Sequence, residues 1–122
     1  MVRDFKNIKA WQHAYDLCVL AYCKTRSLPK EELYGVTSQL RRSVVSVPAN
    51  IAEGANREHK KEYLHFLYIA RASLAETEYL LHLSNLLGYL HNDNYKDVER
   101  VREETAKTLQ GHINSVRKET KE

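Results

Sequence analysis

Apolar residues recur at three- and four-residue steps along four long segments of the sequence, a spacing typical of amphipathic α-helices. Only two prolines and four glycines interrupt the 122 residues, far fewer turn residues than a β-sandwich or barrel needs. The length suits one hydrophobic core and is too short for two. We therefore predict an all-α fold, a single domain over residues 1–122 that forms an antiparallel up-down-up-down four-helix bundle, with helices at about 8–26, 38–55, 59–87 and 93–117.

Short polar side chains and one glycine mark the expected helix ends. The residues expected to cap the first, second and fourth helices are Asn7, Thr37 or Ser38, and Asn92 or Asp93. Gly88 is expected to follow the third helix, because glycine readily adopts the left-handed backbone conformation that ends many helices.

Pro48 lies inside the second predicted helix and removes one backbone hydrogen bond there. Because the apolar stripe continues in phase from Val47 to Ile51, we expect a bend at this point and not a break. The alternative is two helices, with Pro48 in the first turn of the second.

Each helix is expected to bury one stripe of side chains. The first stripe is Ile8, Trp11, Tyr15, Cys18 and Tyr22, and the second is Leu40, Val44, Val47 and Ile51. The third is Tyr63, Leu67, Ala70, Leu74, Thr77 and Leu81, widened by Phe66, Ile69, Leu80, Leu83 and Leu87. The fourth is Tyr95, Val98, Val101, Thr105, Leu109, Ile113 and Val116.

The second helix also carries a polar stripe with no lysine, about 130° from its apolar one. Its members are Gln39, Arg42, Ser46, Asn50 and Glu53. If the second and third helices form a hairpin that turns near residue 58, Ser73 lies level with Ser43, and Glu76 lies close to Arg42. We therefore predict a partly buried ion pair between Arg42 and Glu76.

The shorter side chains of this stripe are assigned packing and capping roles. Ser46 is expected to face Ala70 and allow close helix packing, and Asn50 and Glu53 are expected to cap or bridge backbone near the Gly54 connection. The alternative is that the stripe faces the axis of a ring or a ligand cleft.

The sequence also resembles a known family. Its most specific run is Gln39-x-x-Arg42-x-x-x-Ser46-x-Pro48-x-Asn50-Ile51-Ala52-Glu53-Gly54, supported by Leu28-Pro29-x-x-Glu32-x-Tyr34-Gly35 and Ile69-Ala70-x-Ala72-Ser73-Leu74-x-Glu76. These motifs resemble the four-helix bundle family of 23S rRNA intervening-sequence proteins, over roughly residues 5 to 115. One departure is Ala72, where the family more often has glycine.

The resemblance implies a left-handed bundle that assembles into a ring-shaped homopentamer. It also implies relatives among the accessory proteins of diversity-generating retroelements, which bind a reverse transcriptase and nucleic acid.

The residue patterns give little support to catalysis or metal binding. A di-iron bundle needs two Glu-x-x-His pairs, and the chain has one, Glu62 with His65, because Glu78 and His82 have the wrong spacing. Nothing supplies an activated nucleophile or a phosphate-binding loop. We therefore expect a protein that is not an enzyme, with no metal, no cofactor and no small-molecule substrate.

Cys18 and Cys23 lie five residues apart, about 140° around a helix, so they cannot pair within it. The sequence opens with no secretory signal and contains no apolar run long enough to span a bilayer. We expect a cytoplasmic protein with free thiols and no membrane contact.

Nucleic-acid binding is the leading functional hypothesis, although the formal net charge is only +3. The candidate contacts fall in two clusters expected at opposite ends of the bundle: Lys24 and Arg26 at one, and Arg57, Lys60 and Lys61 at the other. A ring would repeat each cluster and strengthen its attraction for RNA or DNA phosphates, with little sequence specificity.

The alternative is a protein-interaction scaffold that does not bind nucleic acid. Tyrosine commonly anchors protein interfaces. The candidates, most simply for self-association, are Tyr15, Tyr22, Tyr63, Tyr68 and Tyr79.

Overall fold

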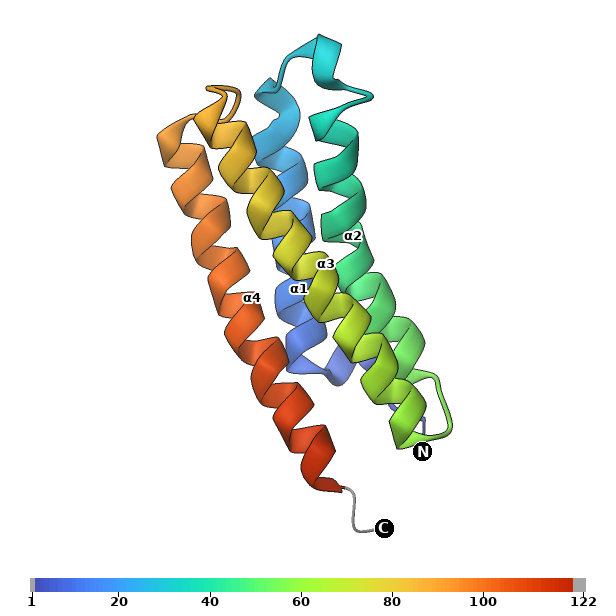
Figure 1. Cartoon of the computed structure of the whole chain (residues 1–122). Helices are drawn as coiled ribbons and strands as arrows, with labels where there is room; N and C mark the ends of the chain where they lie inside the picture. Colours follow the sequence, from blue (N-terminus) through green and yellow to red (C-terminus); the bar gives the residue numbers. More distant parts are fainter. Residues whose placement is uncertain (1, 120–122) are drawn as a thin grey trace.

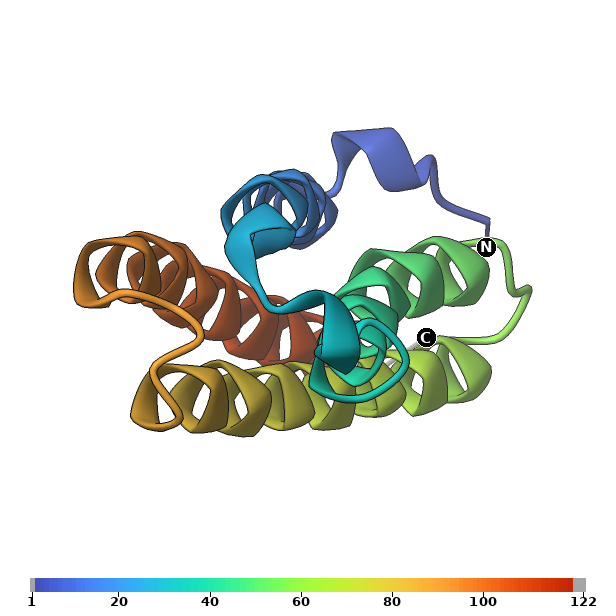
Figure 2. The same ribbon diagram turned by 90° about the horizontal axis from the view of Figure 1, so that it is seen from above.

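The computed structural model describes residues 2–119. Its four long helices are α1 (Lys9–Lys24), α2 (Val36–Ala55), α3 (Lys60–Leu86) and α4 (Asn92–Lys118), and the short 3-10 helices η1 (Phe5–Asn7), η2 (Thr25–Ser27) and η3 (Lys30–Glu32) flank α1. Successive long helices run in opposite directions around a common core (Figures 1 and 2). The predicted all-α up-down four-helix bundle is confirmed.

The two ends of the bundle differ in what they carry (Figure 1). The α2–α3 end holds the turn between those helices, the N-terminal segment and the last turn of α4. The α1–α2 end holds η2, η3 and the α3–α4 connection. The two predicted basic clusters therefore do lie at opposite ends.

Helix α2 runs unbroken through Pro48, so the two-helix alternative is wrong. The proline is buried, and the residues one turn on either side of it, Val44 and Ile51, are both fully buried. Packing of the apolar stripe thus holds the helix together across the missing hydrogen bond.

The predicted helix caps are wrong. We expected Asn7, Thr37 or Ser38, and Asn92 or Asp93 to precede α1, α2 and α4. The residues in these positions are instead Ile8, Gly35 and His91, and none of them provides a side-chain cap. The short polar side chains serve other contacts. The Nδ2 of Asn7 donates to Asp4, which caps η1, and the Oδ1 of Asn92 accepts a hydrogen bond from Asn85 at 2.8 Å.

Glu32 supplies the cap of α2 from four residues upstream. One of its carboxylate oxygens accepts the backbone N–H of Val36 at 3.3 Å, and the other accepts the hydroxyl hydrogen of Tyr89 at 3.0 Å. This hydrogen bond to the carboxylate raises the pKa of Tyr89. Glu32 therefore joins the start of α2 to the connection that follows α3.

The end of α3 follows the prediction at Gly88. Its φ is +78°, and its N–H donates to the carbonyl of Asn85 while the N–H of Tyr89 donates to that of Ser84. This pair of bonds is the Schellman motif, which satisfies the last carbonyls of a helix.

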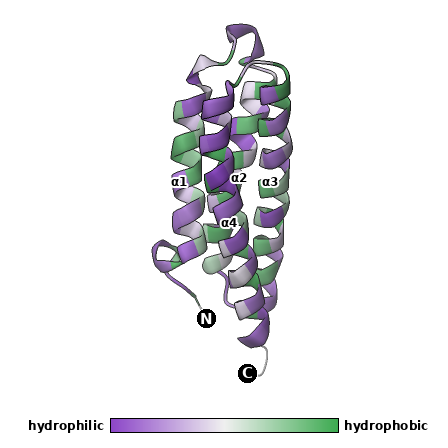
Figure 3. Ribbon diagram, turned by 90° about the vertical axis from the view of Figure 1, so that its left-hand side faces the viewer, coloured by the Kyte–Doolittle hydropathy of each residue, from purple (hydrophilic) through white to green (hydrophobic). Residues whose placement is uncertain are grey.

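The predicted core stripe of α2 is buried, as is most of the α4 stripe, where Tyr95 and Val101 are half-buried. The main α3 stripe and Leu80 are buried, but the residues predicted to widen it are half-buried (Phe66, Ile69 and Leu83) or exposed (Leu87). Apolar side chains fill the bundle interior. The ribbon of α4 is largely hydrophilic on the side turned to the viewer in Figure 3. In α4 the sequence pattern missed Arg102, whose side chain is almost completely buried.

The predicted phase of the α1 stripe is wrong. The buried residues of this helix are Ala10, Ala14, Leu17 and Ala21. Of the predicted stripe, Ile8 is buried, Trp11 and Cys18 are half-buried, and Tyr15 and Tyr22 are exposed. Small alanine side chains let α1 approach its neighbours closely, so the aromatic row lies about one residue step, or 100°, around the helix from the core.

Both cysteines are free, as expected. Burial raises the pKa of the Cys18 thiol, whereas Cys23 is exposed. None of the helices in the described part of the chain has the combined length and apolar character that a bilayer-spanning helix requires.

Candidate nucleic-acid interface

The polar stripe of α2 divides into a half-buried part and an exposed part. In the half-buried part, the Oγ of Ser73 donates to the Oγ of Ser46 at 2.9 Å, and the Nδ2 of Asn50 donates to the same oxygen at 2.9 Å. One turn away, Ser43 and Thr77 share a fully buried hydrogen bond of 2.9 Å. Short hydroxyl side chains therefore fill the contact between α2 and α3.

The predicted ion pair between Arg42 and Glu76 is wrong. Both side chains are exposed, as is Gln39, and within residues 2–119 no ion pair joins them. The helices meet through serine and threonine at this level, so the contact leaves no room for an arginine and a glutamate between them. Ser73 was also predicted to lie opposite Ser43, but its observed hydrogen-bond partner on α2 is Ser46, three residues further along.

The prediction that Asn50 and Glu53 cap the backbone near Gly54 is wrong. The Nδ2 of Asn50 donates back to the carbonyl of Ser46 at 2.8 Å, one turn toward the start of α2. Glu53 is exposed and pairs with Arg57 at 3.1 Å. The exposed part of the stripe is thus available on the surface, and its predicted place at a ring axis or ligand cleft stays a prediction.

Of the five basic side chains predicted to contact nucleic acid, two have carboxylate partners. Lys24 lies 3.4 Å from Asp97, and Arg57 pairs with Glu53. In the part of the chain that the structure describes, Arg26, Lys60 and Lys61 form no ion pair.

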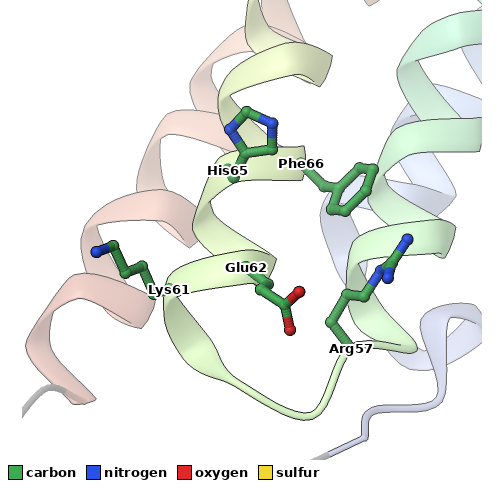
Figure 4. Close-up of a pocket in the computed structure, with 5 residues that line it drawn as sticks. All are labelled: Arg57, Lys61, Glu62, His65 and Phe66. Carbon is green, nitrogen blue, oxygen red and sulfur yellow. The ribbon is translucent and has the colours of Figure 1, made fainter.

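A shallow hollow of about 460 Å³ lies at the α2–α3 end (Figure 4). It is lined by Arg57, Lys61, Glu62, His65 and Phe66. The guanidinium of Arg57 lies 4.9 Å from the centre of the Phe66 ring, and Lys61 extends from the other side of α3. Glu62 stands between the two cations, so this hollow alone is a weak anion site.

A stronger cationic surface, missed by the sequence analysis, lies on the face of α3 that Lys61 shares. Tyr68 follows Lys61 by two helical turns and therefore lies on the same face. Two arginines flank the Tyr68 ring: the guanidinium carbons of Arg71 and Arg117 lie 5.0 Å and 5.4 Å from its centre. We call Lys61, Tyr68, Arg71 and Arg117 the α3–α4 strip.

Neutral groups hold the two arginines of the strip in place. Arg71 donates to the side-chain oxygen of Gln110 at 3.1 Å, and Arg117 donates to the Tyr68 hydroxyl at 3.1 Å and to Asn114 at 3.4 Å. Gln110 also donates to Asn114 at 3.1 Å, which closes the network. Because no carboxylate takes part, both guanidinium charges remain available to an anion.

The spacing of Tyr68 and Arg71, three residues apart on one helix, is a sequence signal that could have identified half of the strip. The contribution of Arg117 depends on how α4 lies against α3, which no local pattern contains.

Inside the α2–α3 end of the bundle, the buried Tyr63 contacts His112. The Tyr63 hydroxyl lies 2.6 Å from Nε2 of His112, and Arg3 covers the Tyr63 ring at 4.5 Å while it pairs with Glu119. Burial raises the pKa of Tyr63 to about 12, and burial together with the charge of Arg3 lowers the pKa of His112. Both groups are therefore neutral at pH 7, and the Tyr63 hydroxyl and the imidazole share one hydrogen bond.

The remaining candidates are the tyrosines predicted to anchor an interface and the side chains that could bind a metal ion. Tyr63 is fully buried and belongs to the core, so its predicted role as an interface anchor is wrong, whereas Tyr15, Tyr22 and Tyr79 are exposed. Among residues 2–119, no three histidine, cysteine or acidic side chains lie close enough together to hold a metal ion.

Comparison with known proteins identifies the family and the fold. The family model described as 23S rRNA-intervening sequence protein matches residues 6–111. A crystal structure of a protein of unknown function from the S23 ribosomal protein family of Bacteroides thetaiotaomicron VPI-5482 matches with a TM-score of 0.78 and 24% identity. That match covers 85% of this chain and 97% of the other. A search among curated proteins gives no match.

Proposed function

The chain belongs to the 23S rRNA-intervening sequence protein family, and we propose that it binds the phosphate backbone of RNA or DNA through the α3–α4 strip as a non-enzymatic, oligomeric four-helix bundle. The observation that carries this proposal is the Tyr68 ring between two exposed arginines whose partners are neutral. Exposed arginines without carboxylate partners suit phosphate, and a guanidinium plane held on an aromatic ring can stack on an unpaired base.

The strip supports backbone recognition and little sequence readout. Its arginines project from the outer surfaces of two helices that pack side by side, and contacts to phosphate carry no sequence information. Lys60 and Lys61 extend the positive charge toward the α2–α3 turn, so a strand that lies along α3 meets both groups. In a homopentamer, as the family resemblance implies, five such strips would act on one strand.

Replacement of both strip arginines, Arg71→Gln with Arg117→Gln, is expected to weaken binding of a single-stranded RNA oligonucleotide and to flatten its salt dependence. The plot of log affinity against log salt concentration loses about 0.7 in slope for each single-strand phosphate contact that is removed, so the slope falls by about 1.4 for each subunit that contacts the RNA. Fluorescence anisotropy across a salt series measures both quantities.

The matched control is Lys96→Gln with Arg100→Gln, which removes the same charge from exposed positions on α4. An equal loss in the control would mean that net charge alone attracts RNA and that the strip is no site. Absence of RNA and DNA binding by the unaltered protein at low salt would reject the function itself.

A second candidate function, a self-associating scaffold that does not bind nucleic acid, is favoured by the aromatic face of α1. Trp11 and Tyr15 stack with ring centres 5.2 Å apart, and Tyr15 and Val19 remain 51% and 49% exposed. Aromatic and apolar groups held at helical spacing on an outer face are the type of surface that subunit contacts bury.

Charge placed on this face, by Tyr15→Arg with Val19→Arg, is expected to lower the mass of the assembly measured by sedimentation equilibrium. Burial of two guanidinium groups in a subunit contact is costly because each loses its hydration. Leu86→Arg, at an exposed position at the end of α3, serves as the control and is expected to leave the mass unchanged. If the unaltered protein is a monomer, both this contact and the pentamer are excluded.

A further inference from the structure

One buried hydroxyl at the α1–α2 end has no hydrogen-bond partner. Thr37 lies in the first turn of α2 and is 4% exposed, and its Oγ1 is the one buried side-chain polar atom of residues 2–119 that contacts no donor or acceptor. An unsatisfied buried hydroxyl costs about 1–3 kcal/mol, so its presence calls for an explanation.

Thr37 lies between two surface hollows, of about 430 Å³ and 140 Å³, which share Leu33, Thr37 and Arg41 as lining residues. Because they share these residues, the two hollows form one cleft, lined by residues from the end of α1, the segment that contains η3 and the start of α2. Figure 1 shows these three segments together at the α1–α2 end of the bundle. The cleft begins at the N-terminus of the 20-residue helix α2, where the Glu32 carboxylate already binds the N–H of Val36, so its attraction for an anion must come from the side chains that line it.

The side chains that line the cleft carry only positive charge. Its cations are Arg26, Lys30, Arg41 and Arg42, and no aspartate or glutamate lines either hollow. None of the four forms an ion pair with any residue between 2 and 119. The nearby carboxylate of Glu32 is already held by Val36 and Tyr89.

Arg41 is held in place by neutral groups, as an anion-binding arginine should be. Its Nε donates to the Oγ1 of Thr25 at 3.2 Å, and its guanidinium lies over the Tyr22 ring, 4.7 Å from the ring centre. Its Nη2 also donates to the carbonyl of Tyr22 at 3.4 Å. Stacking and two hydrogen bonds to neutral groups fix the orientation of the guanidinium, and its charge remains unpaired. Arg42, the next residue, is exposed and forms no ion pair within the described residues.

We propose that this cleft binds the terminal phosphate monoester of a nucleotide, with Arg41 and Arg42 around the phosphate, and that binding uncovers the buried hydroxyl of Thr37, which then donates to the phosphate. Four unpaired cations favour a doubly charged monoester over a singly charged carboxylate or backbone diester. Tyr34, which lines the wider hollow and is 93% exposed, is placed to stack on the attached base. The inference deepens the proposed function, on which it rests, by assigning a separate site for the end of the strand.

The test compares two RNA oligonucleotides of one sequence, one with a 5′-phosphate and one with a 5′-hydroxyl, measured by fluorescence anisotropy. The phosphorylated strand is expected to bind about 10-fold more tightly to the unaltered protein. Adenosine monophosphate and inorganic phosphate are then added as competitors. Adenosine monophosphate is expected to weaken binding of the 5′-phosphorylated strand and not of the 5′-hydroxyl strand. Inorganic phosphate should compete less well, because it has no base to stack.

Two variants test the named residues, and each is expected to remove the 10-fold difference. Arg42→Gln alters an exposed side chain, so the fold should be unaffected. Thr37→Val replaces an unpartnered buried hydroxyl with a methyl group of similar size, so thermal stability should be equal or higher while the preference for the phosphorylated end is lost. Arg100→Gln, at an exposed position on α4, is the charge control and should keep the preference.

Equal affinity for the two strands would overturn the phosphate site while leaving the proposed binding of nucleic acid along the α3–α4 strip intact. Failure of both strands to bind would reject the proposed function. The site would then survive only if adenosine monophosphate binds by itself, with a dissociation constant that Arg42→Gln raises. Displacement of the phosphorylated strand by a polyglutamate peptide as effectively as by the nucleotide would also overturn it, since the cleft would then recognise negative charge and no nucleotide.

Discussion

Gly54→Ala is expected to destabilise the bundle by about 2 kcal/mol, although alanine is the better helix former. A Cβ at this position would lie 2.7 Å from the Cβ of Phe66 and 3.0 Å from Cδ1 of Tyr63. It would also lie 3.3 Å from the carbonyl oxygen of Tyr63, which belongs to the backbone of α3 and cannot rotate away. An overpacking cost of about 3 kcal/mol therefore outweighs a gain of about 1 kcal/mol in helix propensity.

Thermal unfolding followed by circular dichroism measures this change, since about 1 kcal/mol shifts Tm by about 4 °C in a domain of this size. Gly111→Ala is the matched control. A Cβ there meets nothing within 4 Å, so the variant should be more stable by about 1 kcal/mol. Opposite signs at the two glycines are the expected outcome, and a stabilised Gly54→Ala protein would show that α2 and α3 do not approach this closely.

The close approach at Gly54 also gives a physical meaning to the end of the Asn-Ile-Ala-Glu-Gly run. Ile51 is fully buried. Gly54, in the last turn of α2, lets the backbone of that helix approach the first turn of α3 closely. Glu53 and Asn50, in the same run, are not needed for that packing, since one is exposed and the other binds back to Ser46. The motif therefore mixes residues required by the fold with residues that face outward.

The fold was predictable because periodic burial dominates its energetics. An apolar stripe on a helix has one favourable placement, against the core. The stripe of α2 follows this rule, since all four of its residues are fully buried: Leu40, Val44, Val47 and Ile51. The same argument chose the wrong face of α1, because Ala10, Ala14 and Ala21 carry little hydrophobic signal by themselves. Alanines become the buried face only when neighbouring helices pack closely against them.

Contacts between elements were harder to predict than the elements. The hairpin geometry placed α2 and α3 side by side, but a small error in level was enough to pair Arg42 with Glu76 where Ser46 and Ser73 meet. Caps failed for the same reason, since Glu32 reaches the start of α2 from an earlier turn. The α3–α4 strip and the cleft around Thr37 each combine separate segments, so no single stretch of sequence contains them.

Glu99→Gln is expected to destabilise the bundle by about 2 kcal/mol, because Glu99 is the main partner of the buried Arg102. Its carboxylate accepts two hydrogen bonds from the guanidinium, at 2.9 Å and 2.6 Å, and Glu78 on α3 contributes a longer contact at 3.5 Å. The Arg102 side chain is only 9% exposed, so a neutral amide leaves its charge poorly compensated. The free energy of unfolding in urea measures the loss.

Arg102→Met, in contrast, is expected to cost less than Glu99→Gln, although it removes the same ion pair. Methionine keeps the apolar stem of the side chain in the α3–α4 groove, and the two glutamates it leaves, 24% and 55% exposed, remain hydrated. Glu103→Gln breaks an ion pair whose partners are 61% and 74% exposed and should change stability by less than about 0.5 kcal/mol. If Arg102→Met proved the most damaging of the three, the ion pair itself would be the stabilising element, and desolvation of Arg102 would not be the dominant cost.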